Sequence, residues 1–190
     1  IVLNTVYSNG STSGANNALS ITSGAHNFIA NNTLIPSGGI GITISTAGVG
    51  NTTIRNNTIL HPGGVSTTNG ISVSSTTNRI HDNRIILNTT GTNVTGISIG
   101  ATTQLENNHV VIARGVGISA TSAANITRNL INISPGFGTE TGISTASGIN
   151  NNITNNTVEI NFSTGGNALF IGSSTNVYGN NITILSGSSL

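Results

Sequence analysis

The chain has no cysteine, methionine, tryptophan or lysine, and these absences exclude several classes of protein. Without cysteine it can form no disulfide and no thiolate metal site. Only 5% of the 190 residues are charged and the net charge is +1, so we expect neither nucleic acid nor an anionic membrane as a partner. No apolar run is long enough to span a bilayer, so we expect no membrane insertion.

The residues that dominate instead are Asn, Thr, Ser and Gly, interleaved with Ile, Val and Leu. Polar bias of this kind often indicates disorder, but disordered chains are usually poor in aliphatic residues. Here the aliphatic residues recur at alternating positions, so the chain can bury a core and we expect it to be folded. It begins at Ile1 in what reads as a strand, which suggests a mature product or a piece of something longer.

One short phrase recurs about every 25 residues, the signature of a solenoid in which each repeat is one coil. The phrase is an aliphatic residue, two further positions, an Asn and then an alternating strand, as in Ile54-Arg55-Asn56-Asn57-Thr58-Ile59. We expect its Asn side chains to stack from coil to coil as a ladder made of Asn32, Asn57, Asn83, Asn108, Asn129, Asn156 and Asn180.

Each repeat divides into three short strands, because the β-branched residues alternate with period two in three segments. A sharp bend must separate the second strand from the third, just before the ladder Asn. The residue preceding that Asn is usually Asn, Asp or Gly, which tolerate left-handed backbone, so we predict a one-residue bend there. Arg128 occupies the same column and is expected to be strained.

These repeats resemble those of the pectin-lyase-like superfamily, in which an Asn ladder marks the turn between the second and third strands. The resemblance implies an all-β fold, a right-handed parallel β-helix of about seven coils, with residues 1–190 forming a single solenoid domain. It does not imply one activity, because that superfamily includes lyases, hydrolases, phage tailspikes, adhesins and surface-layer proteins.

Stacking the coils places one group of charged residues on a common face of three central coils. Arg55, His81 and Glu106 fall in one outward column, about 4.8 Å apart from coil to coil. Asp82 and Gln104 lie beside them. We predict that any binding occurs on this face, through Arg55, Arg79, His81, Arg84, Glu106 and His109.

An enzyme similar to the pectin-degrading members would need an acid and a base carboxylate, and only Asp82 and Glu106 are available, with His81 and Arg55 beside them. Two carboxylates are also few for a calcium site. A site for Zn²⁺ or Cu²⁺ would use His81, Glu106 and His109, but His81 and His109 lie across the bend from one another. We therefore expect no catalytic residue, no metal and no cofactor. A solvated ion-pair stripe is the alternative interpretation of this face.

An outward column of the third strands is aliphatic over four coils, at Ile35, Leu60, Ile86 and Val111. It predicts either an exposed contact stripe or a strip that the long loops cover. A Thr column that could bind ice is interrupted, which argues against that function.

Both ends of the chain read as a third strand, over 1–6 and 182–185, and neither carries a visible cap. Open strand edges invite pairing with another chain, and low charge opposes it little. The chain is therefore expected to be an extracellular or cell-surface structural solenoid, namely a filament subunit, adhesin stalk or surface module. Its expected partner is itself, head to tail or laterally, and glycans are a second possibility. A carbohydrate-binding or carbohydrate-cleaving β-helix is the alternative.

Overall fold

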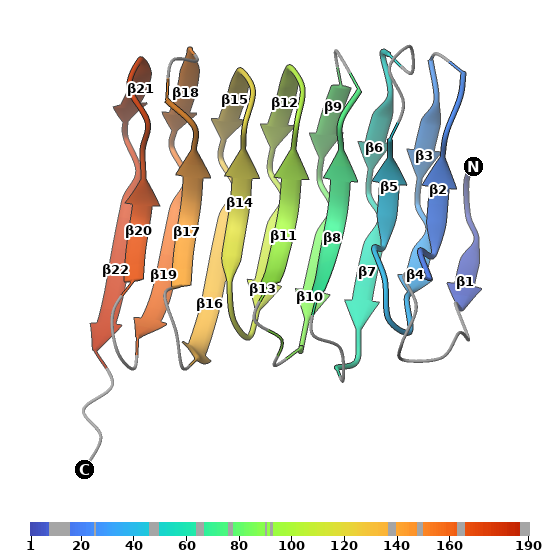
Figure 1. Ribbon diagram of the computed structural model, residues 1–190, viewed down its shortest axis with the longest axis horizontal. Helices are drawn as coiled ribbons and strands as arrows, with labels where there is room; N and C mark the ends of the chain where they lie inside the picture. Colours follow the sequence, from blue (N-terminus) through green and yellow to red (C-terminus); the bar gives the residue numbers. More distant parts are fainter. Residues whose placement is uncertain are drawn as a thin grey trace.

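The computed structural model describes residues 1–7, 16–24, 26–45, 50–63, 67–75, 78–89, 91, 93–136, 140–147, 150–162 and 166–186. Within these ranges all regular structure is β-strand, in three parallel sheets that stack as a solenoid (Figure 1). This confirms the all-β, three-strand parallel solenoid. The right-handed sense of the coil stays an expectation from the rule for parallel crossovers. None of the described residues forms a helix long and apolar enough to cross a membrane.

Each coil contributes one strand to each sheet. The first sheet contains β2 (Leu19–Ile21), β5 (Ile42–Ile44), β8 (Thr67–Val73), β11 (Asn93–Ile99), β14 (Val116–Ala120), β17 (Glu140–Thr145) and β20 (Gly166–Phe170). The second contains β3 (Phe28–Ala30), β6 (Thr53–Arg55), β9 (Asn78–His81), β12 (Thr103–Glu106), β15 (Ala124–Thr127), β18 (Asn151–Thr154) and β21 (Thr175–Tyr178). The third contains β1 (Thr5–Tyr7), β4 (Thr33–Ile35), β7 (Thr58–His61), β10 (Arg84–Leu87), β13 (His109–Ile112), β16 (Leu130–Gly136), β19 (Thr157–Phe162) and β22 (Asn181–Ser186).

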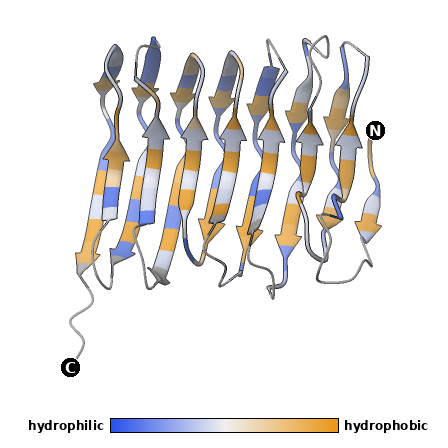
Figure 2. Ribbon diagram, in the orientation of Figure 1, coloured by the Kyte–Doolittle hydropathy of each residue, from blue (hydrophilic) through white to orange (hydrophobic). Residues whose placement is uncertain are grey.

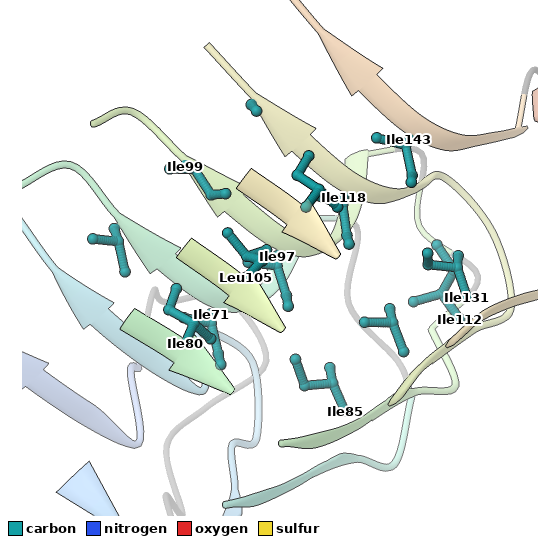
Figure 3. Close-up of a cluster of buried hydrophobic side chains, with 14 of the residues drawn as sticks. Ile71, Ile80, Ile85, Ile97, Ile99, Leu105, Ile112, Ile118, Ile131 and Ile143 are labelled. Atoms are coloured by element: carbon teal, nitrogen blue, oxygen red, sulfur yellow. The ribbon is translucent and has the colours of Figure 1, made fainter. Parts of the chain in front are cut away.

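The core is a set of aliphatic columns, because equivalent residues of successive coils pair in register. In the first sheet Ile71, Ile97, Ile118 and Ile143 are consecutive partners, and all four are fully buried. Side chains of the other two sheets point into the same interior (Figure 3). The same bands of hydrophobic residues repeat from strand to strand along the solenoid (Figure 2). Alternation along each strand thus becomes a continuous core along the axis.

A column of glycines lies within the strands of the first sheet, and the close approach of neighbouring coils requires it. A Cβ atom added to Gly96 would lie 2.5 Å from the carbonyl oxygen of Gly117 on the next coil. Gly70 and Gly142 are crowded in the same way by the neighbouring coil. These glycines are therefore required because a side chain at their positions would collide with the neighbouring coil.

The bend before each ladder Asn has the predicted left-handed backbone at every one of its seven positions. The φ angle is 51° at Asn56, 57° at Asp82 and 67° at Gly179. Arg128 adopts the same conformation with φ 55°, although a side chain with a Cβ normally pays about 1–2 kcal/mol there. The prediction of a one-residue bend is confirmed, including its one unfavourable member.

The Asn ladder is also confirmed, and the bonds from each Asn to the side-chain oxygen of the next Asn all run in one direction. The main-chain nitrogen of Asn57 donates to Oδ1 of Asn83 at 3.0 Å, and Nδ2 of Asn57 lies 3.0 Å from the same oxygen. Nδ2 of Asn57 also donates to the carbonyl oxygens of Ile29 and Arg55. Each amide therefore satisfies backbone groups of two coils that the bend would otherwise leave unpaired.

The ladder has an eighth member that the sequence analysis missed. Asn4 donates from its main-chain nitrogen to Oδ1 of Asn32 at 3.0 Å, and Leu3 before it has φ 58°. Residues 1–6 were expected to be a third strand, but only the part from Thr5 belongs to β1. The segment Ile1-Val2-Leu3-Asn4-Thr5-Val6 fits the repeat phrase, and only Leu3 departs from the usual Asn, Asp or Gly.

The aliphatic stripe of the third sheet was expected to be either an exposed contact stripe or a strip covered by loops, and its side chains are only partly exposed. Leu60 pairs with Ile86 and Ile86 with Val111, as the column predicted. All three side chains and Ile35 are half-buried, so the stripe is partly covered and the choice between the two interpretations stays open. The loops suggested as its cover fall partly outside the described residues, at 64–66, 90 and 92.

Removing a central ladder amide should cost far more than removing a terminal one. In Asn108→Ala the main-chain nitrogen of Asn83 loses its acceptor in the buried interior, and the carbonyl oxygen of Ile80 loses the donor that Nδ2 of Asn108 supplies. We expect the free energy of unfolding to fall by about 3 kcal/mol or more. Asn180→Ala, at a half-buried end position where water can replace the amide, should cost about 1 kcal/mol or less. Urea denaturation measures both, and equal losses would refute the ladder as the cause.

One core column contains a histidine. His61 is buried and pairs with Leu87, and its Nε2 has no hydrogen-bond partner among the described residues. Nδ1 accepts a bond from the main-chain nitrogen of Gly63 at 3.3 Å. Burial lowers the pKa of His61 below its usual 6.5, because the charged imidazolium would be desolvated.

His61→Leu should stabilise the protein by about 1–2 kcal/mol at neutral pH, since an unpaired polar nitrogen is replaced by the residue type of its neighbour. The unfolded chain protonates His61 below about pH 6.5 while the folded chain resists, so wild-type stability falls on acidification. The free energy of unfolding of the variant should therefore decrease less on acidification than that of the wild type. A decrease remains, because the pKa of His109 is also lowered. Thermal unfolding between pH 5 and 8 measures this, with exposed His26→Asn as the control. An unchanged acid-side slope in His61→Leu would contradict the assignment.

Candidate functional site

Part of the predicted charged face is formed where the second strands of the central coils meet the bend. Strand pairing places Arg55 beside His81 and His81 beside Glu106, which confirms the column as a register. Arg79 pairs with Gln104 two residues earlier on the same strands. The face is thus built by three adjacent strands, β6, β9 and β12.

Glu106 is the centre of the face, because it forms ion pairs with two arginines. Its Oε2 lies 3.5 Å from Arg79, and its Oε1 contacts Arg128. Arg128 was not among the predicted site residues. It reaches Glu106 because Thr127 pairs with Glu106, which sets the bend residue of the next coil beside the carboxylate.

His81 is not the outward, accessible group that its column suggested. The residue is only 9% exposed, and its Nδ1 lies 2.7 Å from Oδ2 of Asp82. Ala30 and Thr154 of the same column are buried as well. Asp82 remains exposed at the bend and is therefore the accessible partner of this pair.

Arg55 is held by an aromatic ring. Its guanidinium carbon lies 4.9 Å from the ring centroid of Phe28. Phe28 is on the neighbouring strand β3, two residues before Ala30, the register partner of Arg55. Its Nε is buried without a hydrogen-bond partner among the described residues. A cation–π contact of this kind fixes the arginine and covers part of a half-exposed ring.

Arg84 and His109 form a separate pair on the third sheet, on the other side of the bend. They are register partners, and Arg84 is exposed while His109 is half-buried. Burial lowers the pKa of His109, and the charge of Arg84 lowers it further. Among the described residues, no hydrogen bond or ion pair joins either one to Glu106. The six predicted binding residues thus divide into two groups.

The geometry bears on the catalytic and metal hypotheses. An inverting or retaining hydrolase requires one carboxyl that can donate a proton, and both carboxylates of this face are already paired with basic groups. In the part of the chain that the structure describes, no cluster of three or more His, Cys, Asp or Glu could hold a metal ion. The arrangement is suited to an ion-pair network that joins three coils.

A buried carboxyl away from this face escaped the sequence analysis. Glu140, at the start of β17, is fully buried, and neither of its oxygens has a hydrogen-bond partner among the described residues. Burial raises the pKa of Glu140 above its usual 4.5, and the charge of Arg114 opposes that rise. A lone Glu at a polar-to-strand boundary carries no signal of burial in the sequence.

Glu106→Gln should reduce stability only slightly, by less than about 1 kcal/mol, because its partner arginines are largely solvent-exposed. The reduction should shrink further in high salt, which screens exposed pairs. Urea denaturation at low and high ionic strength measures both effects. The matched control is Glu159→Gln, which removes an exposed carboxylate on the third sheet. A polysaccharide-cleaving activity present in the wild type and lost in Glu106→Gln would contradict the structural role.

Comparison with known proteins adds no relationship: no protein family, no curated protein and no solved structure matches the chain significantly.

Proposed function

We propose that the protein is an extracellular or cell-surface structural solenoid whose copies associate end to end, as in a filament or stalk. We also infer membership of the pectin-lyase-like superfamily, because the Asn ladder stands at the bend between second and third strands as it does there. The single observation that carries the structural role is the distribution of exposed apolar side chains.

Every exposed large hydrophobic side chain that the structure describes lies on the last coil or on the first two coils. At one end they are Ile1, Val2, Leu3, Tyr7 and Phe28, and at the other Phe170, Ile171, Val177, Tyr178, Ile182, Ile184 and Leu185. Val177 and Ile182 continue columns that are fully buried one coil earlier, at Ile153 and Val158. The end coil therefore presents core residues, 41% and 42% exposed, that a further coil would cover.

The Asn ladder gives these ends opposite and complementary chemistry. Among the described residues, the main-chain nitrogen of Asn180 has no acceptor, whereas the equivalent nitrogen of Asn156 donates to Oδ1 of Asn180. At the other end, Oδ1 of Asn4 accepts no bond from the described residues, while Oδ1 of Asn32 accepts from Asn4. A second copy stacked head to tail would bring the free donor to the free acceptor. Head-to-head contacts would not.

Such a joint is heterologous and does not close, which is the geometry of a filament. It would pair β22 with β1 of the next copy, and β21 with the segment around Val2, which already bridges to Ala30 within one copy. The coil of β1 has no strand in the first sheet among the described residues.

The lateral surface supports the same proposal by what it contains. Its charged groups are few, and the main cluster is engaged in ion pairs around Glu106. Little electrostatic repulsion therefore opposes association of copies. A polar surface of Asn, Thr and Ser also suits exposure to solvent along a rod.

Charging the apolar end should abolish association while the coils remain folded. In Ile182→Asp and Ile184→Asp we expect the association constant to fall at least about tenfold, because a carboxylate would be buried against the next copy. Asn4→Ala, which removes the free acceptor, should weaken association with little change in apolar area. Sedimentation velocity over a range of concentrations and electron micrographs measure assembly.

Asn88→Asp adds the same charge at an exposed position on the side of a central coil and should assemble as the wild type does. Circular dichroism and thermal unfolding show whether each variant is folded. Short monodisperse rods at all concentrations for the wild type would overturn the proposal, and would point to a neighbouring coil of the same polypeptide as the natural cover. Loss of assembly in Asn88→Asp equal to that in Ile182→Asp would overturn the end-to-end geometry.

A further inference from the structure

A groove of about 460 Å³ runs across the outer side of the second sheet and the turns that lead into it. Its walls come from five successive coils, from Asn51 before β6 to Asn152 in β18. At the strand spacing of about 4.8 Å, five coils extend over roughly 19 Å along the solenoid axis. The groove borders the charged face, and Arg79 and its register partner Gln104 belong to both.

Amide side chains dominate the lining. Six of the thirteen lining residues carry one, namely Asn51, Asn78, Gln104, Asn125, Asn150 and Asn152. Four threonines also contribute, and the only charged residue is Arg79, which is already paired with Glu106. The groove thus offers many neutral donors and acceptors and almost no net charge.

Part of this amide array is held in a fixed orientation by hydrogen bonds between coils. Nδ2 of Asn152 donates to Oδ1 of Asn125 at 2.8 Å, and Nδ2 of Asn176 donates to Oδ1 of Asn152 at 3.0 Å. The three residues are exposed register partners on β15, β18 and β21. This is a second, external ladder, and its remaining N–H groups and oxygen lone pairs are available to a ligand.

At the groove's floor the hydroxyl of Thr52 is unsatisfied. Thr52 is 1% exposed, and its Oγ1 has no hydrogen-bond partner among the described residues. A buried polar atom without a partner costs about 1–3 kcal/mol, and a bound hydroxyl group or water can remove that cost. The internal ladder has no such deficit, because the amides of its central coils are all paired.

We propose that this groove binds an extended, uncharged, hydroxyl-rich polymer, a linear neutral polysaccharide that lies along the solenoid axis. Each sugar hydroxyl both donates and accepts, as each amide does, so fixed amides one strand apart can bind successive residues of such a chain. Binding requires no ordering of the amides already in the external ladder, which reduces its entropic cost.

Two other ligand classes fit the groove less well. An acidic polysaccharide would need several unpaired cations, and the groove contains one paired arginine. A peptide strand is usually bound through an open sheet edge and side-chain pockets, whereas this groove lies over the face of a sheet and contains only Ala123 and Ala124 as apolar lining residues.

The test is calorimetric titration of the purified protein with cellohexaose, xylohexaose and mannohexaose. At least one should bind with a Kd on the order of 1 mM or tighter. Its affinity should be nearly independent of salt, since no exposed charge pair forms. Asn125→Ala combined with Asn152→Ala should weaken binding about tenfold, a loss of about 1.4 kcal/mol.

Asn88→Ala removes an exposed amide beyond the third sheet and should leave binding unchanged. The same titration with hexagalacturonate and with a Thr-Val hexapeptide tests the excluded classes. Failure of all three neutral hexasaccharides to bind, or stronger, salt-sensitive binding of hexagalacturonate, overturns the proposal. Preferential binding of the peptide, or an affinity that Asn125→Ala with Asn152→Ala leaves unchanged, does so too. End-to-end assembly is measured separately and does not affect these outcomes.

Discussion

The bend before each ladder Asn is the constraint on which the rest of this structure depends. A chain that reverses direction within one residue leaves backbone donors and acceptors that no sheet can pair, and the Asn side chain supplies their partners in the dry interior. Because Nδ2 of Asn57 bonds to the coil before and the coil after it, one side chain fixes the bend and the stacking together. The short strands, some only three residues long, can then stay in register although each has few bonds of its own.

This constraint also explains which parts of the structure could be predicted from the sequence. Few residue types adopt left-handed backbone readily, so the column of Asn, Asp and Gly predicted the bend. The alternation of Ile and Val predicted the strands. Asn4 was missed because Leu3, which adopts the same left-handed backbone, breaks the column of Asn, Asp and Gly. The site was less predictable. Register gave the neighbours of Glu106 within its column, but the reach of Arg128 and the burial of His81 depend on side-chain packing between coils. The external amide groove depends on the shape of the turns, which periodicity does not report.

The two candidate surfaces follow from the two directions of a solenoid. Along the axis, each coil is covered by the next, so apolar columns stay buried until the last coil exposes Val177 and Ile182. Across the axis, each outward column is repeated at strand spacing, so one polar residue type becomes a regular row, as at Asn125, Asn152 and Asn176. The proposed association at the ends and the proposed recognition along the side would therefore use different residues, so one would not exclude the other.

The polarity of hydrogen bonding connects these surfaces to the interior. In both ladders the amide nitrogen of one coil donates to the oxygen of a neighbouring coil, but the internal ladder donates toward the end of the chain while the external one donates toward its beginning. An internal amide donates both hydrogens, to the next Asn and to carbonyl oxygens. The direction of donation therefore matters only at the ends, where Asn180 has a main-chain N–H without an acceptor and Asn4 has a side-chain oxygen without a donor among the described residues. Each amide of the external row Asn125, Asn152 and Asn176 donates at most one of its two hydrogens to its neighbour. The same side chain, repeated at the same spacing, thus favours a directional joint where it is buried and a binding row where it is exposed.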